Sequence, residues 1–202
     1  MPDATENRQL TDRQTAVETQ ILLGAVKCFE NDGIRGTTIN SIAAQAGVSR
    51  RTVYRYYATK ELILKAAFEK NSFDLAQQLV KSVDPDLSFP DFVVEVIVFM
   101  IEHAPHSPLF KVNIIEEIGA GSLYYYFSSK KAVTTWIELF QPAYIRALRE
   151  ETVDPEFDLP EIVEWAGRIS NSFLQNPRTM HRDTPIVRDS IQRLVGKALR
   201  RI

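Results

Sequence analysis

The sequence is poor in cysteine and has no long apolar run. Cys28 is the single cysteine, so no disulfide can form within the chain. The longest purely apolar run, Val96 to Ile101, is far shorter than the roughly 18 residues that suggest a membrane-spanning helix. The opening MPDATENRQLTDRQ also lacks the apolar stretch of a signal peptide. These absences argue against a disulfide scaffold and a membrane protein, and they favour the reducing cytoplasm.

Acidic residues are missing from one segment of an otherwise acidic chain. Between Ile34 and Lys60 there is no Asp or Glu, whereas five basic residues fall there: Arg35, Arg50, Arg51, Arg55 and Lys60. Because the whole chain has a formal net charge of -2, the remainder is acidic. A local basic segment can bind a polyanion while the acidic remainder limits indiscriminate adhesion. The charge distribution therefore indicates nucleic acid as a partner.

Signals for β-structure are absent as well. No alternating β-branched run is bounded by a hairpin signal, whereas apolar residues recur at spacings of three and four residues throughout. We therefore predict an all-α protein. The expected helices cover residues 13–31, 39–46, 50–57, 60–82, 89–103, 108–118, 122–150, 160–174 and 184–201.

Two of the expected short helices are joined by a tight turn. Thr38 is a suitable N-cap for helix 39–46, which Gly47 ends, and Ser49 is a suitable N-cap for helix 50–57. Thr59 can cap the long helix that follows. Three shorter helices thus precede one long one.

Helix 50–57 has two different faces. At 100° per residue, Val53 and Tyr57 fall on one face, and Arg51 and Arg55 fall on the opposite face. We expect the apolar pair to pack inward and the arginines to point outward, flanked by further hydroxyl, aromatic and basic groups: Arg50, Thr52, Tyr54 and Tyr56. Arginine can bond guanine O6 and N7 together, while Tyr and Thr hydroxyls can reach phosphate oxygens. The inventory suits a major groove.

Two other positions suggest phosphate contacts. Thr37 and Thr38 stand at a helix start, where backbone N–H groups favour an anion. Lys60 stands in the first turn of the long helix, where the macrodipole disfavours a cation, although Glu61 offsets this. A bound phosphate would explain the position of Lys60.

The stretch ILLGAVKCFENDGIRGTTINSIAAQAGVSRRTVYRYYATKELILKAAF resembles the N-terminal helix-turn-helix domain of TetR-family transcriptional regulators. It covers about a quarter of the chain. Its most specific part is the ordered set Phe29, Gly33, Thr37, Thr38, Ile42, Ala43, Ala46, Gly47, Val48, Ser49, Thr52, Tyr54, Tyr57, Lys60 and Leu62. One departure is visible, because Tyr56 occupies the place of His in the Tyr-x-His-Phe pattern common in the family; a phenol can still donate to phosphate.

The resemblance implies a domain organisation and a function. Residues 1–12 would form a flexible N-terminal arm, 13–59 a helix-turn-helix DNA-binding domain, and 60–202 an effector-binding and dimerisation domain. It implies a homodimer that binds a palindromic operator in duplex DNA as a repressor and is released by a small molecule. The expected DNA-binding residues are Thr37, Thr38, Asn40, Ser49, Arg50, Arg51, Thr52, Tyr54, Arg55, Tyr56 and Lys60. Among them Arg50, Arg51 and Arg55 are assigned to base reading, and Asn40 is a weaker choice.

Aromatic residues in the second part have two plausible uses. Consecutive aromatics point around a helix, so some pack in the core while others can line a cavity for a mainly apolar effector. The candidate pocket residues are Phe99, His103, Phe110, Tyr125, Trp136 and Phe140. Apolar stripes in the last two helices could close the core, whereas the resemblance places them in a dimer interface: Ile162, Trp165, Ile169, Phe173, Ile191, Leu194, Val195 and Ala198.

Other function classes find less support. No Gly-rich phosphate loop, nucleophile elbow or paired metal motif occurs, so we expect no enzyme, cofactor or metal site. Cys28 is expected in the core. His103 and His106 with nearby glutamates have no specific metal-ligand spacing. The competing hypothesis is a helical protein that binds a small molecule or a partner and no longer uses DNA.

Overall fold

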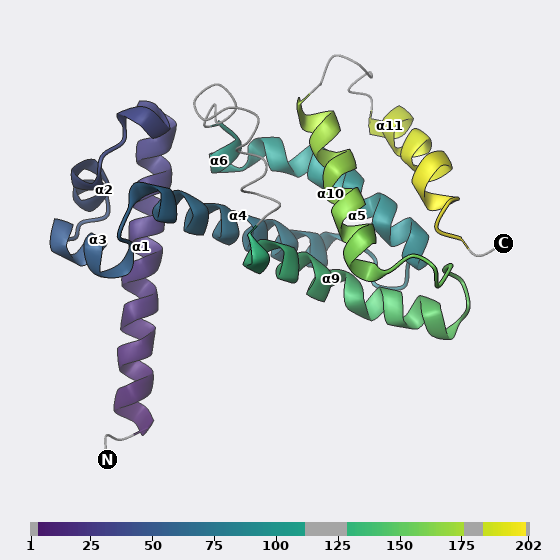
Figure 1. Ribbon diagram of the computed structural model, residues 1–202, viewed down its shortest axis with the longest axis horizontal. Coiled ribbons are helices and arrows are strands. Elements are labelled where there is room, and N and C mark those ends of the chain that lie inside the picture. The colour runs from purple at the N-terminus through teal and green to yellow at the C-terminus, as the bar shows by residue number, and fades with distance from the viewer. Residues whose placement is uncertain (1–3, 112–128, 176–183, 201–202) are drawn as a thin grey trace. The chain divides into compact units, whose positions relative to one another are not determined.

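The computed structural model describes residues 4–111, 129–175 and 184–200. All regular elements in these ranges are helical, which confirms the all-α prediction. The chain separates into two compact units (Figure 1). Unit 1 comprises residues 1–70 and 108–125, and unit 2 comprises residues 71–107 and 126–202.

Unit 1 is built around its first helix. Helix α1 (Ala4–Gly36) lies beside α2 (Ile39–Gln45) and α3 (Arg50–Tyr56), and α4 (Lys60–Ser82) follows (Figure 1). Helix α1 begins nine residues before the expected start at Arg13, inside the segment assigned to an arm. Gly33 has a φ of 69° and interrupts the helical path near the expected stop. The short helix α6 (Pro108–Lys111) contacts α1.

The core of unit 1 contains large apolar side chains from each of the helices α1 to α4. At most 1% of the surface is exposed in five of them: Ile21 and Phe29 of α1, Ile42 of α2, Val53 of α3 and Ile63 of α4. Burial of each such side chain contributes about 1.5–3 kcal/mol. The short helices α2 and α3 therefore depend on this core, because helices of 7 residues are not stable alone.

Helix caps define where α2 and α3 start, as the sequence indicates. The Thr38 side chain accepts the Ser41 N–H, and the Ser41 side chain accepts the Thr38 N–H, forming a capping box. The Ser49 hydroxyl accepts the Thr52 N–H at 3.0 Å. Gly47, with a φ of 67°, makes the turn between the two helices in a conformation that L-residues rarely adopt.

Unit 2 is organised around helix α5 (Phe89–His103), eight of whose residues are buried. Helix α5 contacts α9 (Lys130–Arg149), α10 (Leu159–Gln175), α11 (Thr184–Ile191) and the π-turn η2 (Gln192–Gly196), and the 3-10 turn η1 (Ala104–His106) follows it. The last helix ends at Ile191, earlier than expected, because the chain changes there to i→i+5 bonding. Residues 112–118 and 122–128 of two expected helices lie outside the described residues.

Polar contacts attach the C-terminal segment to α5. The Asp91 carboxylate accepts from Gln192 at 2.6 Å and from Arg200 at 3.0 Å, and Arg188 pairs with Glu95. Burial by itself would raise the pKa of Asp91, but the hydrogen bonds from Ser88 and Gln192 and the charge of Arg200 together outweigh it, so the pKa lies below the ordinary value. In the described ranges, no helix is long and apolar enough to cross a membrane.

Gly24 allows α1 to approach the end of α2 closely. An added Cβ at Gly24 would lie 2.9 Å from the Ala46 backbone nitrogen. We therefore expect Gly24→Ala to lower the free energy of unfolding by about 1–3 kcal/mol through overpacking, measured by chemical denaturation. Gly36→Ala is the matched control, because its Cβ would meet Asp32 at an ordinary 3.4 Å. Equal stabilities of the two variants would contradict the close packing.

Candidate nucleic-acid interface

The inner face of α3 is held against α1. Val53 is fully buried and Tyr57 is 8% exposed, as the helical projection predicts. The Tyr57 hydroxyl donates to Glu18 Oε1 of α1 at 2.7 Å. Burial, and then the Glu18 carboxylate, raise the pKa of Tyr57 far above its ordinary value, so the phenol remains a donor. Helix α3 is thereby attached to α1 by apolar packing and a hydrogen bond.

The outer face of α3 presents three exposed arginines. Arg50, Arg51 and Arg55 are all exposed. The Arg50 guanidinium lies 5.3 Å from the centre of the exposed Tyr54 ring and donates to its hydroxyl at 3.3 Å. The Arg55 guanidinium lies 5.3 Å from the centre of the Tyr56 ring. Aromatic neighbours thus orient two of the three guanidinium groups.

Other residues of the expected DNA face stabilise the start of α3 and attach this helix to α1. The hydroxyls of Ser49 and Thr52 lie 2.9 Å apart and bond to each other. The half-buried Tyr56 donates its hydroxyl to the Gln14 carbonyl oxygen of α1 at 3.3 Å. Tyr56 therefore links α3 to α1.

The two threonines at the start of α2 have different environments. Thr38 is exposed, as is Asn40 in the first turn of α2. Thr37 is 2% exposed, and both its hydroxyl and its N–H donate to the Gly33 carbonyl, at 2.7 and 3.2 Å. The Thr37 side chain is turned into the protein, which removes its hydroxyl from the outer surface that was expected for it.

Lys60 has protein partners that explain its position. Its ammonium donates to the Ile34 carbonyl at 2.6 Å and to the Thr37 carbonyl at 2.9 Å. These two carbonyls compensate the cation at a helix N-terminus, where sequence reasoning invokes a phosphate. An ammonium has three hydrogens, so at most one is left for a phosphate. The contact depends on how the chain folds back after α1, and no sequence spacing signals it.

The expected effector residues do not form one group. Phe99 and His103 stack at 4.1 Å, and His103 Nδ1 lies 3.1 Å from the Phe99 carbonyl oxygen. Phe140 is 1% exposed and meets two α5 rings edge-on, those of Phe89 and Phe92.

The other three candidates lie elsewhere. Trp136 is half-buried and donates its ring N–H to Ser72 at 2.7 Å. Phe110 belongs to unit 1, whereas Phe99, His103, Trp136 and Phe140 belong to unit 2. Tyr125 lies outside the described residues. Of the candidate effector residues in unit 2, Phe99 and Phe140 are buried in the core.

Six of the eight expected dimer residues, by contrast, line one apolar cleft, whereas Phe173 and Ile191 do not. A cleft of about 260 Å³ lies between α10 and the C-terminal segment, lined in part by Trp165, Ile169, Leu194, Val195 and Ala198. Trp165 is 58% exposed and Leu194 is 76% exposed, whereas Ile162 and Ile191 are buried. Phe173 is half-buried on α10. Sequence reasoning missed Phe157, which also lines the cleft, because it lies in a turn outside the helical stripes.

The structure also shows the surroundings of the single cysteine and of the candidate metal ligands. Cys28 is 5% exposed, and burial raises the pKa of its thiol, which disfavours the reactive thiolate. Within the described ranges, no three His, Cys, Asp or Glu side chains are grouped so that they could hold a metal ion.

The fold and the surface define an all-α protein with an N-terminal helix-turn-helix, in which α3 presents an arginine-rich face. Residues 21–67 match the family model for bacterial regulatory proteins of the tetR family. Over 71 residues, 35% of this chain, the sequence is 37% identical to the HTH-type transcriptional repressor SCO4008 of Streptomyces coelicolor. That alignment spans 36% of the relative's length. The N-terminal part of the chain is therefore similar to the DNA-binding domain of tetR family regulators.

Solved structures share the fold over most of the chain. The transcriptional regulator FadR from Bacillus subtilis, in complex with stearoyl-CoA, has a TM-score of 0.63 and 16% identity and covers 90% of this chain and 98% of its own. A candidate tetR family transcription regulator from Shewanella sp. PV-4 has a TM-score of 0.61 and 16% identity, covering 92% of this chain and 99% of its own. At these identities the likeness concerns the fold alone.

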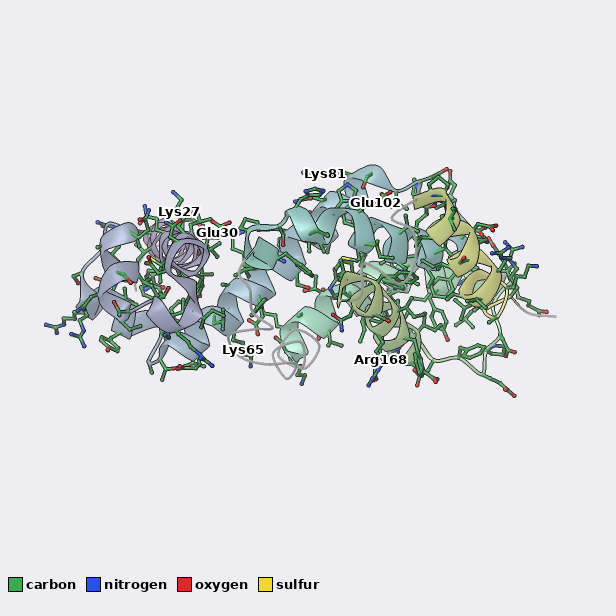
Figure 2. The ribbon with its side chains drawn as sticks, turned by 90° about the horizontal axis from the view of Figure 1, so that it is seen from above. Lys27, Glu30, Lys65, Lys81, Glu102 and Arg168 are labelled. Carbon is green, nitrogen blue, oxygen red and sulfur yellow. The ribbon has the colours of Figure 1, made fainter. Side chains whose placement is uncertain are left out.

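The Lys60 contacts predict a structural effect. Lys60→Met leaves the carbonyls of Ile34 and Thr37 without their charged donor, so we expect the free energy of unfolding to fall by about 1–3 kcal/mol in denaturant titrations. Lys65→Met is the control, because Lys65 lies on the same helix, α4 (Figure 2). An unchanged stability, together with a salt dependence of DNA binding reduced by about one unit, would instead assign Lys60 to a phosphate.

Proposed function

We propose that this chain is a cytoplasmic transcriptional repressor that binds a palindromic operator as a homodimer and is released by a small, mainly apolar molecule. The observation that carries the proposal is the exposed arginine face of α3, fixed from behind by buried Val53 and Tyr57. A rigid helix with outward guanidinium groups can enter a major groove without first ordering itself, which lowers the entropic cost of binding.

Base reading is assigned first to Arg51. It is exposed on the face of α3 opposite Val53, and a guanidinium can make two hydrogen bonds with guanine O6 and N7. Arg50 and Arg55 stand on either side of it, and Asn40, Thr38, Ser49, Thr52 and Tyr54 supply further polar groups near the duplex. Contacts to phosphate set the register, while contacts to base edges set the preference for one sequence.

The homodimer is supported by the apolar cleft between α10 and the C-terminal segment. A soluble monomer seldom leaves a Trp and a Leu more than half exposed beside the same apolar cleft. In a two-fold dimer each such side chain is buried twice, once in each copy. Two DNA-binding domains can then occupy half-sites whose centres lie about 34–36 Å apart.

An effector would release the DNA by changing the distance between the DNA-binding domains of the two protomers. Helix α4 runs continuously from unit 1 into unit 2, and its 23 residues span roughly 35 Å at 1.5 Å per residue. A ligand that prefers a wrongly spaced dimer would lower operator affinity, and reversing a 99:1 equilibrium requires a preference of about 10⁴-fold. The aromatic content of unit 2 favours a mainly apolar ligand, with the Phe99–His103 stack as the candidate contact.

Selection of bound fragments from a random duplex pool tests the repressor proposal. We expect a palindromic site, and we expect Arg51→Ala to lose about 1–3 kcal/mol of binding free energy on that site with a relaxed base preference. Arg149→Ala, which removes an exposed charge at the end of α9, is the control. If the wild-type chain folds normally and selects no sequence, the result contradicts the repressor proposal. It then favours the competing hypothesis of a helical protein that binds a small molecule or a partner.

Disruption of the apolar cleft tests the homodimer. Leu194→Asp places a charge on the 76% exposed side chain of the cleft, twice in each dimer, so we expect dissociation to monomers at micromolar concentration in sedimentation experiments. Leu148→Asp, at a 38% exposed position on α9, should leave the dimer intact. A dimer unaffected by Leu194→Asp would place the interface elsewhere.

A further inference from the structure

A second surface of unit 1 lies where the helix-turn-helix meets α1. A cleft of about 400 Å³ opens between α1 and α3; we refer to it as the α1–α3 cleft. Its lining residues come from both helices and the turn before α3: Arg13, Gln14, Val17, Val48, Thr52, Arg55 and Tyr56. Helix α1 runs beyond α2 and α3 toward the N-terminus, so Arg13 lies within a continuous helix and not at its end (Figure 1).

The charge of the α1–α3 cleft has one sign. Arg13 and Arg55 contribute two cations, and the lining contains no carboxylate. Both arginines are exposed, so each guanidinium can still bind a ligand. At an open surface, two like charges on neighbouring helices favour an anion that neutralises both.

The walls of the α1–α3 cleft are fixed in place. The Tyr56 hydroxyl donates to the Gln14 carbonyl, so α3 and α1 are bonded to each other at the cleft. The Arg55 guanidinium lies 5.3 Å from the centre of the Tyr56 ring, which limits its rotamers. Val17 and Val48 supply an apolar surface between the polar groups. The cleft thus combines two cations with an apolar wall, the inventory for a sugar-phosphate unit.

We propose that the α1–α3 cleft receives the sugar-phosphate backbone of the operator, with Arg13 and Arg55 on a phosphate and the two valines against the deoxyribose. This inference rests on the proposed function, because Thr52 and Arg55 belong both to the cleft and to the outer face of α3. A guanidinium can make two parallel hydrogen bonds with a phosphate. Arg13 becomes a DNA-binding residue of α1, and Arg55 holds the backbone while Arg51 reads bases.

Salt-titrated binding of the full chain to the selected site and to a scrambled duplex of equal length tests the cleft. We expect Arg13→Ala to weaken binding to both duplexes by a similar factor, about 3- to 10-fold near 0.1 M salt, and to reduce the slope of log K against log salt by about one unit. Arg13→Lys should retain most of the slope, because the charge remains. The thermal midpoint should not change, since Arg13 is exposed.

Lys27→Ala is the matched control. Lys27 is exposed on the same helix, outside the cleft, roughly 21 Å further along the axis, and points outward (Figure 2). Arg13→Ala behaving like Lys27→Ala, while the wild-type chain binds its site, would overturn the inference and leave the repressor proposal standing. A loss confined to the selected site would overturn it too, because Arg13 would then read bases. A wild-type chain with no preference for any duplex would overturn the proposed function itself.

Discussion

The attachment of α3 to α1 is the constraint on which the DNA-facing surface depends. Helix α3 has only 7 residues and cannot hold its shape alone. Val53 anchors it in the core, and the hydroxyls of Tyr57 and Tyr56 bond to Glu18 and Gln14 of α1. With its inner side fixed, the arginines on the other side have defined directions. The α1–α3 cleft lies between the same two helices, so it depends on the same attachment.

The contact between the start of α4 and the end of α1 is a second constraint on the helix-turn-helix. The Lys60 ammonium joins the start of α4 to the carbonyls of Ile34 and Thr37, so the position of α4 is coupled to the loop that precedes α2. Any movement of α4 must either carry this loop with it or break charged hydrogen bonds. In the repressor that we propose, this coupling gives α4 a direct mechanical connection to the helix-turn-helix.

Unit 2 combines a buried aromatic core with an apolar surface. Phe140 packs edge-on against two rings of α5, and those contacts close the core without a partner. Trp165 and Leu194 remain exposed beside a cleft instead. The contrast separates residues that stabilise the monomer from residues suited to a two-fold interface, a distinction that hydrophobic periodicity cannot make, because both groups occupy apolar stripes of their helices.

Local periodicity and hydrogen bonding are enough to predict the helical class, the turn between α2 and α3, their caps at Thr38 and Ser49, and the buried side of α3. Three features could not be predicted in this way: Thr37 points inward, Lys60 bonds to carbonyls 23 and 26 residues away, and Arg13 shares a cleft with Arg55. Each of these depends on how the helices pack against one another. Contacts between distant segments leave no period in the sequence from which they could be inferred.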